Sequence, residues 1–196
     1  EPVRATAEAD LTGRLARYMA GARDRALPPE VVHDAKLRVL DTLGAMVSGS
    51  RLKAGQMAAA FVKGQGGIAE SSVVGTKIRT SATLAAFANA MSAHADETDD
   101  SHAPSLCHPG CAIVPAALAM GERERAGGTA LLRAVALGYD IGTRINMSLN
   151  AYEFREDGHS THSFGPMFGS AAAAGALCGF NERQARHLLS YTAQQA

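Results

Sequence analysis

Apolar residues recur every three or four positions over most of the chain, which is the spacing of amphipathic α-helices. The clearest pattern lies between residues 29 and 49, and its apolar positions are Val32, Ala35, Val39, Leu43 and Met46. Proline is favoured in the first turn of a helix and glycine at its end. We therefore expect this helix to begin at Leu27-Pro28-Pro29-Glu30 and to end near Gly49.

The same spacing predicts further helices along the chain. Four of them cover residues 11–20, 54–62, 82–93 and 111–124. Three more follow: one begins at Thr129, one runs from Pro166 to about residue 178, and one begins after Asn181. Thr80 or Ser81 is expected to cap the helix over residues 82–93, and Asn181 with Gln184 has the spacing of a capping box. The faces expected to be apolar are Leu11, Leu15 and Tyr18 in the first helix, and Leu132, Val135, Ala136 and Tyr139 in the one after Thr129.

Only one segment has β character. Residues 71–74 are too short to build a sheet alone, and they follow the helix-breaking run Gly64-Gln65-Gly66-Gly67. The chain has no Trp, 5% aromatic residues and 20 Gly, with much of its apolar content as Ala. Small residues let helices approach closely, so we expect an all-α, Ala/Gly-rich multi-helix bundle forming one helical domain over residues 1–196.

Charge and cysteine content narrow the class of protein. Lys plus Arg and Asp plus Glu both number 19, so the formal net charge is zero, which argues against a nucleic-acid or anionic-membrane partner. No apolar stretch is long enough for a membrane span. Cys107, Cys111 and Cys178 fit no disulfide framework, so reduced thiols in a cytoplasmic protein are expected over a structural zinc clip.

Two polar segments, residues 94–110 and 150–164, are predicted to be loops. They hold five of the seven histidines, namely His94, His102, His108, His159 and His162. The first segment also holds four carboxylates, which are Asp96, Glu97, Asp99 and Asp100. Three interpretations stay open on this pattern alone: a solvated acidic loop, a metal site built from His and Asp, or a proton-transfer site.

The positions of these segments favour proton transfer. Each is predicted to end where a helix begins, at His108-Pro109-Gly110 and at Phe164-Gly165-Pro166. Helix N-termini present unpaired N–H groups and attract carboxylates, and a carboxylate beside an imidazole orients it and stabilises its charged form. If the two segments meet in space, the site would suit a small polyanion.

Several motifs in these segments resemble the signature of the MmgE/PrpD family. They are Asn89-Ala90, His94, Glu97-Thr98-Asp99-Asp100-Ser101-His102, His108-Pro109-Gly110 and His159-Ser160-Thr161-His162-Ser163-Phe164-Gly165. Shorter supporting matches are Leu27-Pro28-Pro29-Glu30, Leu40-Asp41-Thr42-Leu43-Gly44, Val74-Gly75, and Gly138-Tyr139-Asp140 with Arg144. The resemblance runs from about Leu11 to the end of the chain. It implies a helical domain, a smaller α/β lid domain, a homodimer, and no metal or organic cofactor.

The resemblance also implies roles for individual residues. His108 and His159 match the active-site histidines, while Glu97 and Ser101 stand where the family has Asp and Thr, so these four are the expected catalytic residues. Asp100, His102 and Thr161 are expected to bind substrate, and His94 and His162 have a weaker case. The family includes 2-methylcitrate dehydratase, cis-aconitate decarboxylase and an iminodisuccinate epimerase, which share proton transfer next to a carboxylate.

We therefore predict a lyase, foremost a dehydratase, that acts on a small di- or tricarboxylate such as 2-methylcitrate. The alternatives are a decarboxylase or epimerase of the same family, a non-catalytic assembly subunit, and a metal-dependent hydrolase using His102 and His108. Family members are more than twice as long, so the lid domain is expected to be absent from this chain or to lie on a second chain. Partners are then the substrate, a second copy, or a lid-bearing chain.

Overall fold

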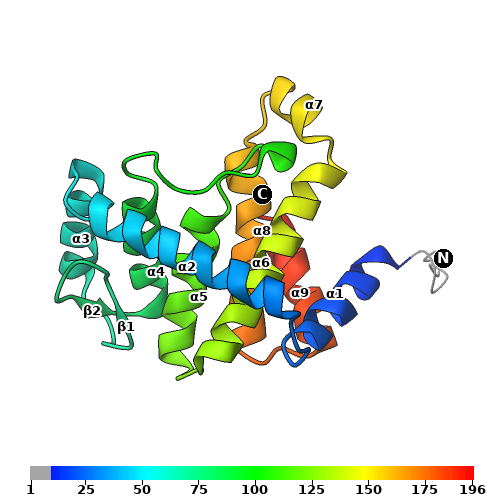
Figure 1. Cartoon of the computed structure of the whole chain (residues 1–196), viewed down its shortest axis with the longest axis horizontal. Helices are drawn as coiled ribbons and strands as arrows, with labels where there is room; N and C mark the ends of the chain where they lie inside the picture. The colour runs from blue at the N-terminus through cyan, green and yellow to red at the C-terminus, as the bar shows by residue number, and fades with distance from the viewer. Residues whose placement is uncertain (1–9) are drawn as a thin grey trace.

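Nine α-helices make up most of residues 10–196, the part of the chain that the computed structural model describes (Figure 1). Their bounds are α1 Leu11–Ala22, α2 Pro29–Gly49, α3 Lys53–Gln65, α4 Ala82–Ala93, α5 Gly110–Arg123, α6 Gly128–Ser148, α7 Ala151–Glu156, α8 Thr161–Leu177 and α9 Glu182–Ala193. The strands β1 (Ser71–Ser72) and β2 (Arg79–Thr80) form one short antiparallel pair, with Ser71 opposite Thr80. The expected all-α fold class is confirmed. The expected domain covers residues 1–196, and its residues 1–9 lie outside the described part.

Most predicted helices begin and end close to where their sequence signals place them. Pro29 opens α2, the Ser81 side chain accepts a hydrogen bond from the Leu84 N–H at the start of α4, and Asn181 forms the expected capping box with Gln184. α3 runs past Gly64 to Gln65, and the next residue, Gly66, has a φ of +70°, which glycine adopts freely.

The second polar segment was predicted wrongly. Residues 150–164 hold the short helix α7 and the start of α8, so this segment is a loop only between these helices. α8 begins at Thr161, after Ser160 accepts a hydrogen bond from the Ser163 N–H, and Pro166 lies inside it. Proline is common at a helix start, but here it sits further in, where it leaves the carbonyl of His162 without its helical partner.

The buried faces of α1 and α6 also differ from the expected ones. In α1 the buried residues are Gly13, Ala16 and Met19, while Leu11 and Tyr18 are exposed. In α6 Val135 is buried as expected, but Leu132, Ala136 and Tyr139 are half-buried. Since α6 packs against both α5 and α8, its buried surface is wider than one apolar stripe and includes Gly138, Gly142 and Asn146.

The core consists of three hydrophobic clusters. One joins α1, α6, α8 and α9 around Met19, Ile141 and Phe168. The second joins α2, α4, α5, α6 and α8 around Met46, Ile113 and Val135. The third joins α3, α4 and α5 with Val73, which follows β1. No helix among residues 10–196 has both the length and the apolar content needed to cross a membrane.

The connection between α4 and α5 runs along the upper edge of the molecule in Figure 1, the same edge at which α7 and the start of α8 lie. This connection, residues 94–109, contains one 3-10 turn, η1 (Ala103–Ser105), and an isolated antiparallel bridge between His102 and Cys107. Both histidine-bearing segments are therefore held at one end of the helical bundle.

Candidate acid–base site

Two adjacent carboxylates in the α4–α5 connection are buried and point to different partners. The side chain of Asp99 is 0% exposed and that of Asp100 is 6% exposed. Successive side chains of an extended segment face opposite sides. Asp99 therefore points toward histidine side chains, while Asp100 points toward a backbone N–H group and other donors.

Asp100 is the anchoring carboxylate. It accepts hydrogen bonds from the Gly110 N–H (2.8 Å), the Tyr139 hydroxyl (2.8 Å) and the Arg38 guanidinium (3.3 Å). A negative charge at the N-terminus of α5 is favourable because the unpaired N–H groups of that turn face it. Burial and the nearby Asp100 charge raise the pKa of Tyr139, so its hydroxyl stays protonated as a donor. Asp100 thereby fixes the turn that carries His108.

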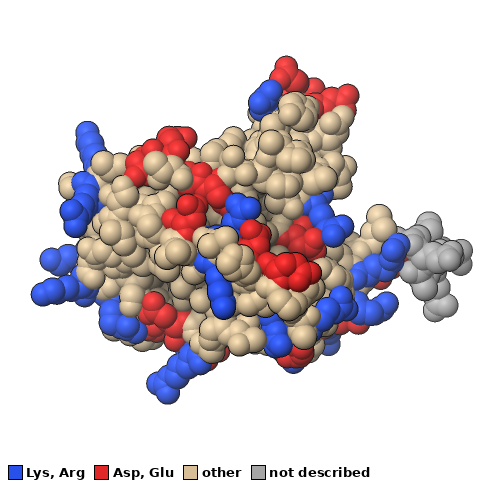
Figure 2. Space-filling view, in the orientation of Figure 1, with Lys and Arg blue, Asp and Glu red and all other residues tan. Residues whose placement is uncertain are grey.

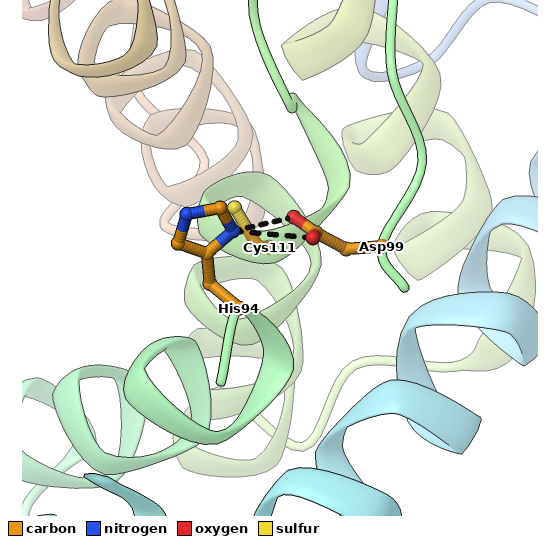
Figure 3. A group of neighbouring side chains, drawn as sticks. All are labelled: His94, Asp99 and Cys111. Atoms are coloured by element: carbon orange, nitrogen blue, oxygen red, sulfur yellow. Dashed lines mark hydrogen bonds and ion pairs between the residues drawn. The ribbon is translucent and has the colours of Figure 1, made fainter. Parts of the chain in front are cut away.

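Asp99 faces two imidazoles instead, and a third imidazole stacks on one of them. Its two oxygens each lie 3.1 Å from Nδ1 of His94, and Oδ2 lies 3.7 Å from Nδ1 of His108. The rings of His94 and His108 are 5.5 Å apart between centroids, and the His162 ring stacks on His108 at 5.1 Å with a 22° interplanar angle. We call His94, Asp99, His108 and His162 the histidine cluster. Figure 3 shows how Asp99 and Cys111 approach His94.

The cluster holds its members in different protonation environments. Burial, and then the positive charge that His108 and His94 can carry, lower the pKa of His162. A neutral imidazole is a proton acceptor near pH 7. Nδ1 of His108 is shielded from solvent and has no hydrogen-bond partner among the described residues. Burial, together with Asp99, raises the pKa of the Cys111 thiol, which donates to the His108 carbonyl (3.2 Å).

The two polar segments meet, as the expected site requires. The Thr161 hydroxyl donates to the Leu106 carbonyl (2.6 Å). The buried Asn146 amide joins the same segments, because its Nδ2 donates to the carbonyls of Ser105 (3.0 Å) and Thr161 (2.7 Å). Asn146 belongs to α6, so this helix positions the start of α8 against the α4–α5 connection. That position lets His162 reach His108.

The other expected site residues lie around the cluster or away from it. Glu97 is 75% exposed, adopts a positive φ of 58° and lies 3.6 Å from Nε2 of His94. The ring of His159 is exposed and stacks on Phe154 at 4.5 Å. Ser101 and His102 line a separate cavity of about 230 Å³, together with Arg38 and Asp100. Thus only His108 of the four expected catalytic residues lies in the cluster, and Glu97 borders it.

Sequence reasoning gave too little weight to three residues of the cluster. Asp99 was passed over in favour of its neighbour Asp100, and His94 and His162 received a weaker case than His159. Alternation along the Asp99-Asp100 pair signals that only one carboxylate can face the histidines. The pairing of His162 with His108 has no such local signal, since it depends on where α8 begins.

One group of side chains in the described chain could hold a metal ion. Nδ1 of His94, a carboxylate oxygen of Asp99 and Sγ of Cys111 all lie within 4.8 Å of one another. Without a metal, the same geometry is that of an acid–base site, in which a buried carboxylate orients imidazoles that can give or take a proton.

Sequence comparisons relate the chain to known proteins. Residues 13–196 match the MmgE/PrpD N-terminal domain. The chain is 28% identical over 178 residues to the cis-aconitate decarboxylase-like protein oryM of Aspergillus oryzae, covering 87% of this chain and 36% of that protein. It is 28% identical over 192 residues to the human cis-aconitate decarboxylase, covering 95% and 40%, and 26% identical to the mouse enzyme, covering 95% and 39%.

These relatives are enzymes, and the chain spans about two-fifths of their length. The matched region covers almost all of the described helices and includes every residue of the histidine cluster. The chain belongs to the MmgE/PrpD family.

Proposed function

We propose that this chain supplies the acid–base histidines of a lyase that acts on a small di- or tricarboxylate. The observation that carries the proposal is the histidine cluster, in which a fully buried carboxylate lies 3.1 Å from one imidazole and 3.7 Å from a second. A carboxylate behind an imidazole fixes its orientation and favours its protonated form, as general acid–base catalysis requires.

Decarboxylation of a cis-aconitate-like substrate is the first candidate reaction, and it is supported by the names of the relatives. Loss of CO2 breaks a carbon–carbon bond and leaves its electron pair on the carbon. An imidazolium of the cluster then delivers a proton to that carbon. His108 is suited to this role because its ring lies between those of His94 and His162, and Asp99 can stabilise its positive charge.

Dehydration of a 2-methylcitrate-like substrate is the second candidate. It needs a base that removes the proton next to a carboxylate and an acid that protonates the departing hydroxyl. His162 and His108 offer such a pair, because their rings stack at 5.1 Å and the lowered pKa keeps His162 neutral. The cluster therefore supports either reaction, and substrate contacts decide between them.

The substrate carboxylates need cationic groups that the cluster does not supply. Figure 2 shows acidic side chains gathered over the α4–α5 connection. Arg38, the cation paired with Asp100, lines the separate cavity beside Ser101. We expect the cations to come from another part of the complete enzyme, such as a lid domain on the same or a second chain, or a second copy in a homodimer. Fixed charges of this kind stabilise developing charge in the reaction.

The test is the conversion of cis-aconitate and of 2-methylcitrate by the complete assembly that contains this chain, followed as CO2 release and as water loss. His108→Gln, His94→Gln and His162→Gln are each expected to lower kcat by about 10²- to 10⁴-fold. His33→Gln on the exposed face of α2 is the matched control and should leave turnover unchanged. Unchanged kcat in His108→Gln would disprove the proposed function.

The variant His159→Gln tests whether His159 or His162 is the second catalytic imidazole beside His108. If catalysis depends on His108 with His159, as the family motif implies, this variant loses as much activity as His108→Gln. If catalysis rests on the histidine cluster alone, its loss is much smaller than that of His162→Gln. Either outcome identifies the second imidazole.

A further inference from the structure

The side chains of His94, Asp99 and Cys111 converge on one point with a mixed set of donor atoms, and His108 lies beside them. Nδ1 of His94, a carboxylate oxygen of Asp99 and Sγ of Cys111 lie within 4.8 Å of one another. His94 begins the α4–α5 connection, Asp99 lies within it, and Cys111 belongs to the first turn of α5 (Figure 3). Nδ1 of His108 lies 3.7 Å from the same carboxylate. The proposed acid–base reaction uses the imidazoles and the carboxylate, but it gives the thiol no role.

We propose that these four side chains form a binding site for a borderline divalent transition-metal ion, of which Zn²⁺ fits best, and that the bound ion inhibits the enzyme by occupying His108. Imidazole nitrogen, thiolate sulfur and carboxylate oxygen are the donors that Zn²⁺ accepts in four-coordinate sites. Mg²⁺ and Ca²⁺ prefer sets of oxygen atoms and do not suit this one. Metal binding itself does not rest on the proposed function; only the inhibition does.

The distances favour such a site. In a tetrahedral zinc site with bonds of about 2.0–2.2 Å to nitrogen and oxygen, those two ligand atoms lie about 3.3 Å apart. The corresponding separations here are 3.1 Å for His94 and Asp99, and 3.7 Å for His108 and Asp99. The two nitrogen–oxygen separations therefore need to change by only a few tenths of an ångström, while Sγ of Cys111 and the His108 ring move closer as the ion binds.

A second observation points to a ligand at this position. Nδ1 of His108 is shielded from solvent and lacks a hydrogen-bond partner within the described chain, although buried polar atoms are nearly always paired. The side chain of His94 is 44% exposed, so an ion can reach the buried carboxylate past this ring. The neighbouring acidic residues Asp96, Glu97 and Asp100 give this end of the molecule a negative potential that attracts cations.

Coordination changes the protons of the site in a defined way. The Cys111 thiol loses its proton to solvent and binds the ion as thiolate. The ring proton that His94 shares with Asp99 moves from Nδ1 to Nε2, so that Nδ1 can bind the ion. His108 then binds through Nδ1, and the ion holds its ring away from the substrate. The ion neutralises the charge of Asp99 and blocks the proposed proton transfer.

The test uses Co²⁺ and Zn²⁺ added to the full chain under reducing conditions. Co²⁺ is expected to give a thiolate-to-metal charge-transfer band, and Zn²⁺ is expected to displace it. Cys111→Ser should remove the band and weaken Zn²⁺ binding in calorimetry at least about tenfold. Cys178→Ser is the matched control, because this thiol lies at the far end of α8 beside Arg123 and should leave the band unchanged.

Because Cys111→Ser could disturb packing, His94→Gln serves as a second variant that should weaken Zn²⁺ binding by a similar factor. Absence of the charge-transfer band, or equal Zn²⁺ affinity in Cys111→Ser and the unaltered chain, would overturn the metal site. In the complete assembly, Zn²⁺ should abolish turnover and a chelator should restore it. If the assembly shows no turnover of any polycarboxylate, the proposed function fails while the band and the calorimetry still decide the metal site.

Discussion

The interface between α6 and α8 and the connection between α4 and α5 are built in opposite ways. At the interface, glycines bring two backbones together: a Cβ on Gly138 would lie 2.9 Å from the Gly169 carbonyl oxygen, and one on Gly142 would lie 2.8 Å from that of Gly165. The connection is held instead by buried polar side chains, Asp99 and Asp100 among them. One region depends on the absence of side chains and the other on their hydrogen bonds.

This contrast separates stability from chemistry. Close packing of small residues creates a rigid pair of helices but offers no group that can move a proton. Burying an ionised carboxylate costs free energy unless the group is paired, and buried carboxylates are therefore frequent at functional sites. The tight α6–α8 pair places Asn146 and the start of α8 against the connection, and thereby sets the position of His162 relative to His108.

The largest effect is expected from filling the glycine interface. In Gly169→Val, a Cβ would lie 2.6 Å from the Gly138 carbonyl oxygen and 2.7 Å from Cδ1 of Ile113, and the backbone cannot move away cheaply. We expect the free energy of unfolding to fall by about 3 kcal/mol or more, measured by urea denaturation. In Gly44→Ala, where nothing lies within 4 Å, stability should rise by about 0.5–1 kcal/mol. Equal losses in both variants would contradict the role given to the interface.

The two adjacent carboxylates should respond differently to the same substitution. Asp99→Asn removes the charge that faces the imidazoles, so kcat in the complete assembly should fall at least about 100-fold, which is about 2.7 kcal/mol of barrier. Asp100→Asn instead weakens the bonds to Gly110, Tyr139 and Arg38, and should lower the free energy of unfolding by about 1–3 kcal/mol. A larger loss of kcat in Asp100→Asn would reverse the assignment of the two roles.

The junction between the two regions should show an intermediate effect. Asn146→Ala removes two buried hydrogen bonds, to the carbonyls of Ser105 and Thr161. The free energy of unfolding should therefore drop by about 1–3 kcal/mol, as measured by thermal or chemical denaturation. Ser148→Ala, an exposed position of the same helix, serves as a control and should change stability by less than about 0.5 kcal/mol.

The smallest effect concerns the contact between α1 and α9, at a distance from both regions. A hydrogen bond from Arg186, and then one from the Gly13 N–H, lower the pKa of Asp10 from its ordinary value of 3.8. Because the pKa of this carboxyl is lower in the folded than in the unfolded chain, its ionised form stabilises the fold at pH values above the unfolded pKa. This contribution is lost as the pH falls through the folded-state pKa. Asp10→Asn should thus lower the free energy of unfolding at neutral pH. The difference between the variant and the unaltered chain should shrink as the pH falls below about 4. A deficit that persists at low pH would show that the ion pair is not its cause.

Much of the fold could be predicted from the chain alone. Period, capping residues and proline–glycine punctuation located α2, α4 and α9 to within a few residues, because a helix depends on neighbours three and four positions apart. The same signals misplaced the start of α8. Pro166 predicts a helix start, but the Ser160 side chain caps the helix earlier in the chain, and Pro166 lies within α8.

The candidate site was likewise predictable from the sequence only in part. The motif order identified the family and His108, and it placed the histidine-bearing segments at helix starts. It did not show that Asp99 rather than Asp100 faces the imidazoles, or that His162 stacks on His108 while His159 stacks on Phe154. The stacking of His162 on His108 joins segments 54 residues apart, and no local pattern encodes it.

The amino-acid sequence by itself determined the helices, their small-residue composition and the chemistry available at one end of the bundle. The tertiary structure alone decided which of those groups touch. The physical reason is range: helix formation and capping act between residues a few positions apart. The contacts of a buried carboxylate or a stacked imidazole depend on how closely α6 and α8 pack, and glycines on the facing sides of these two helices set that distance.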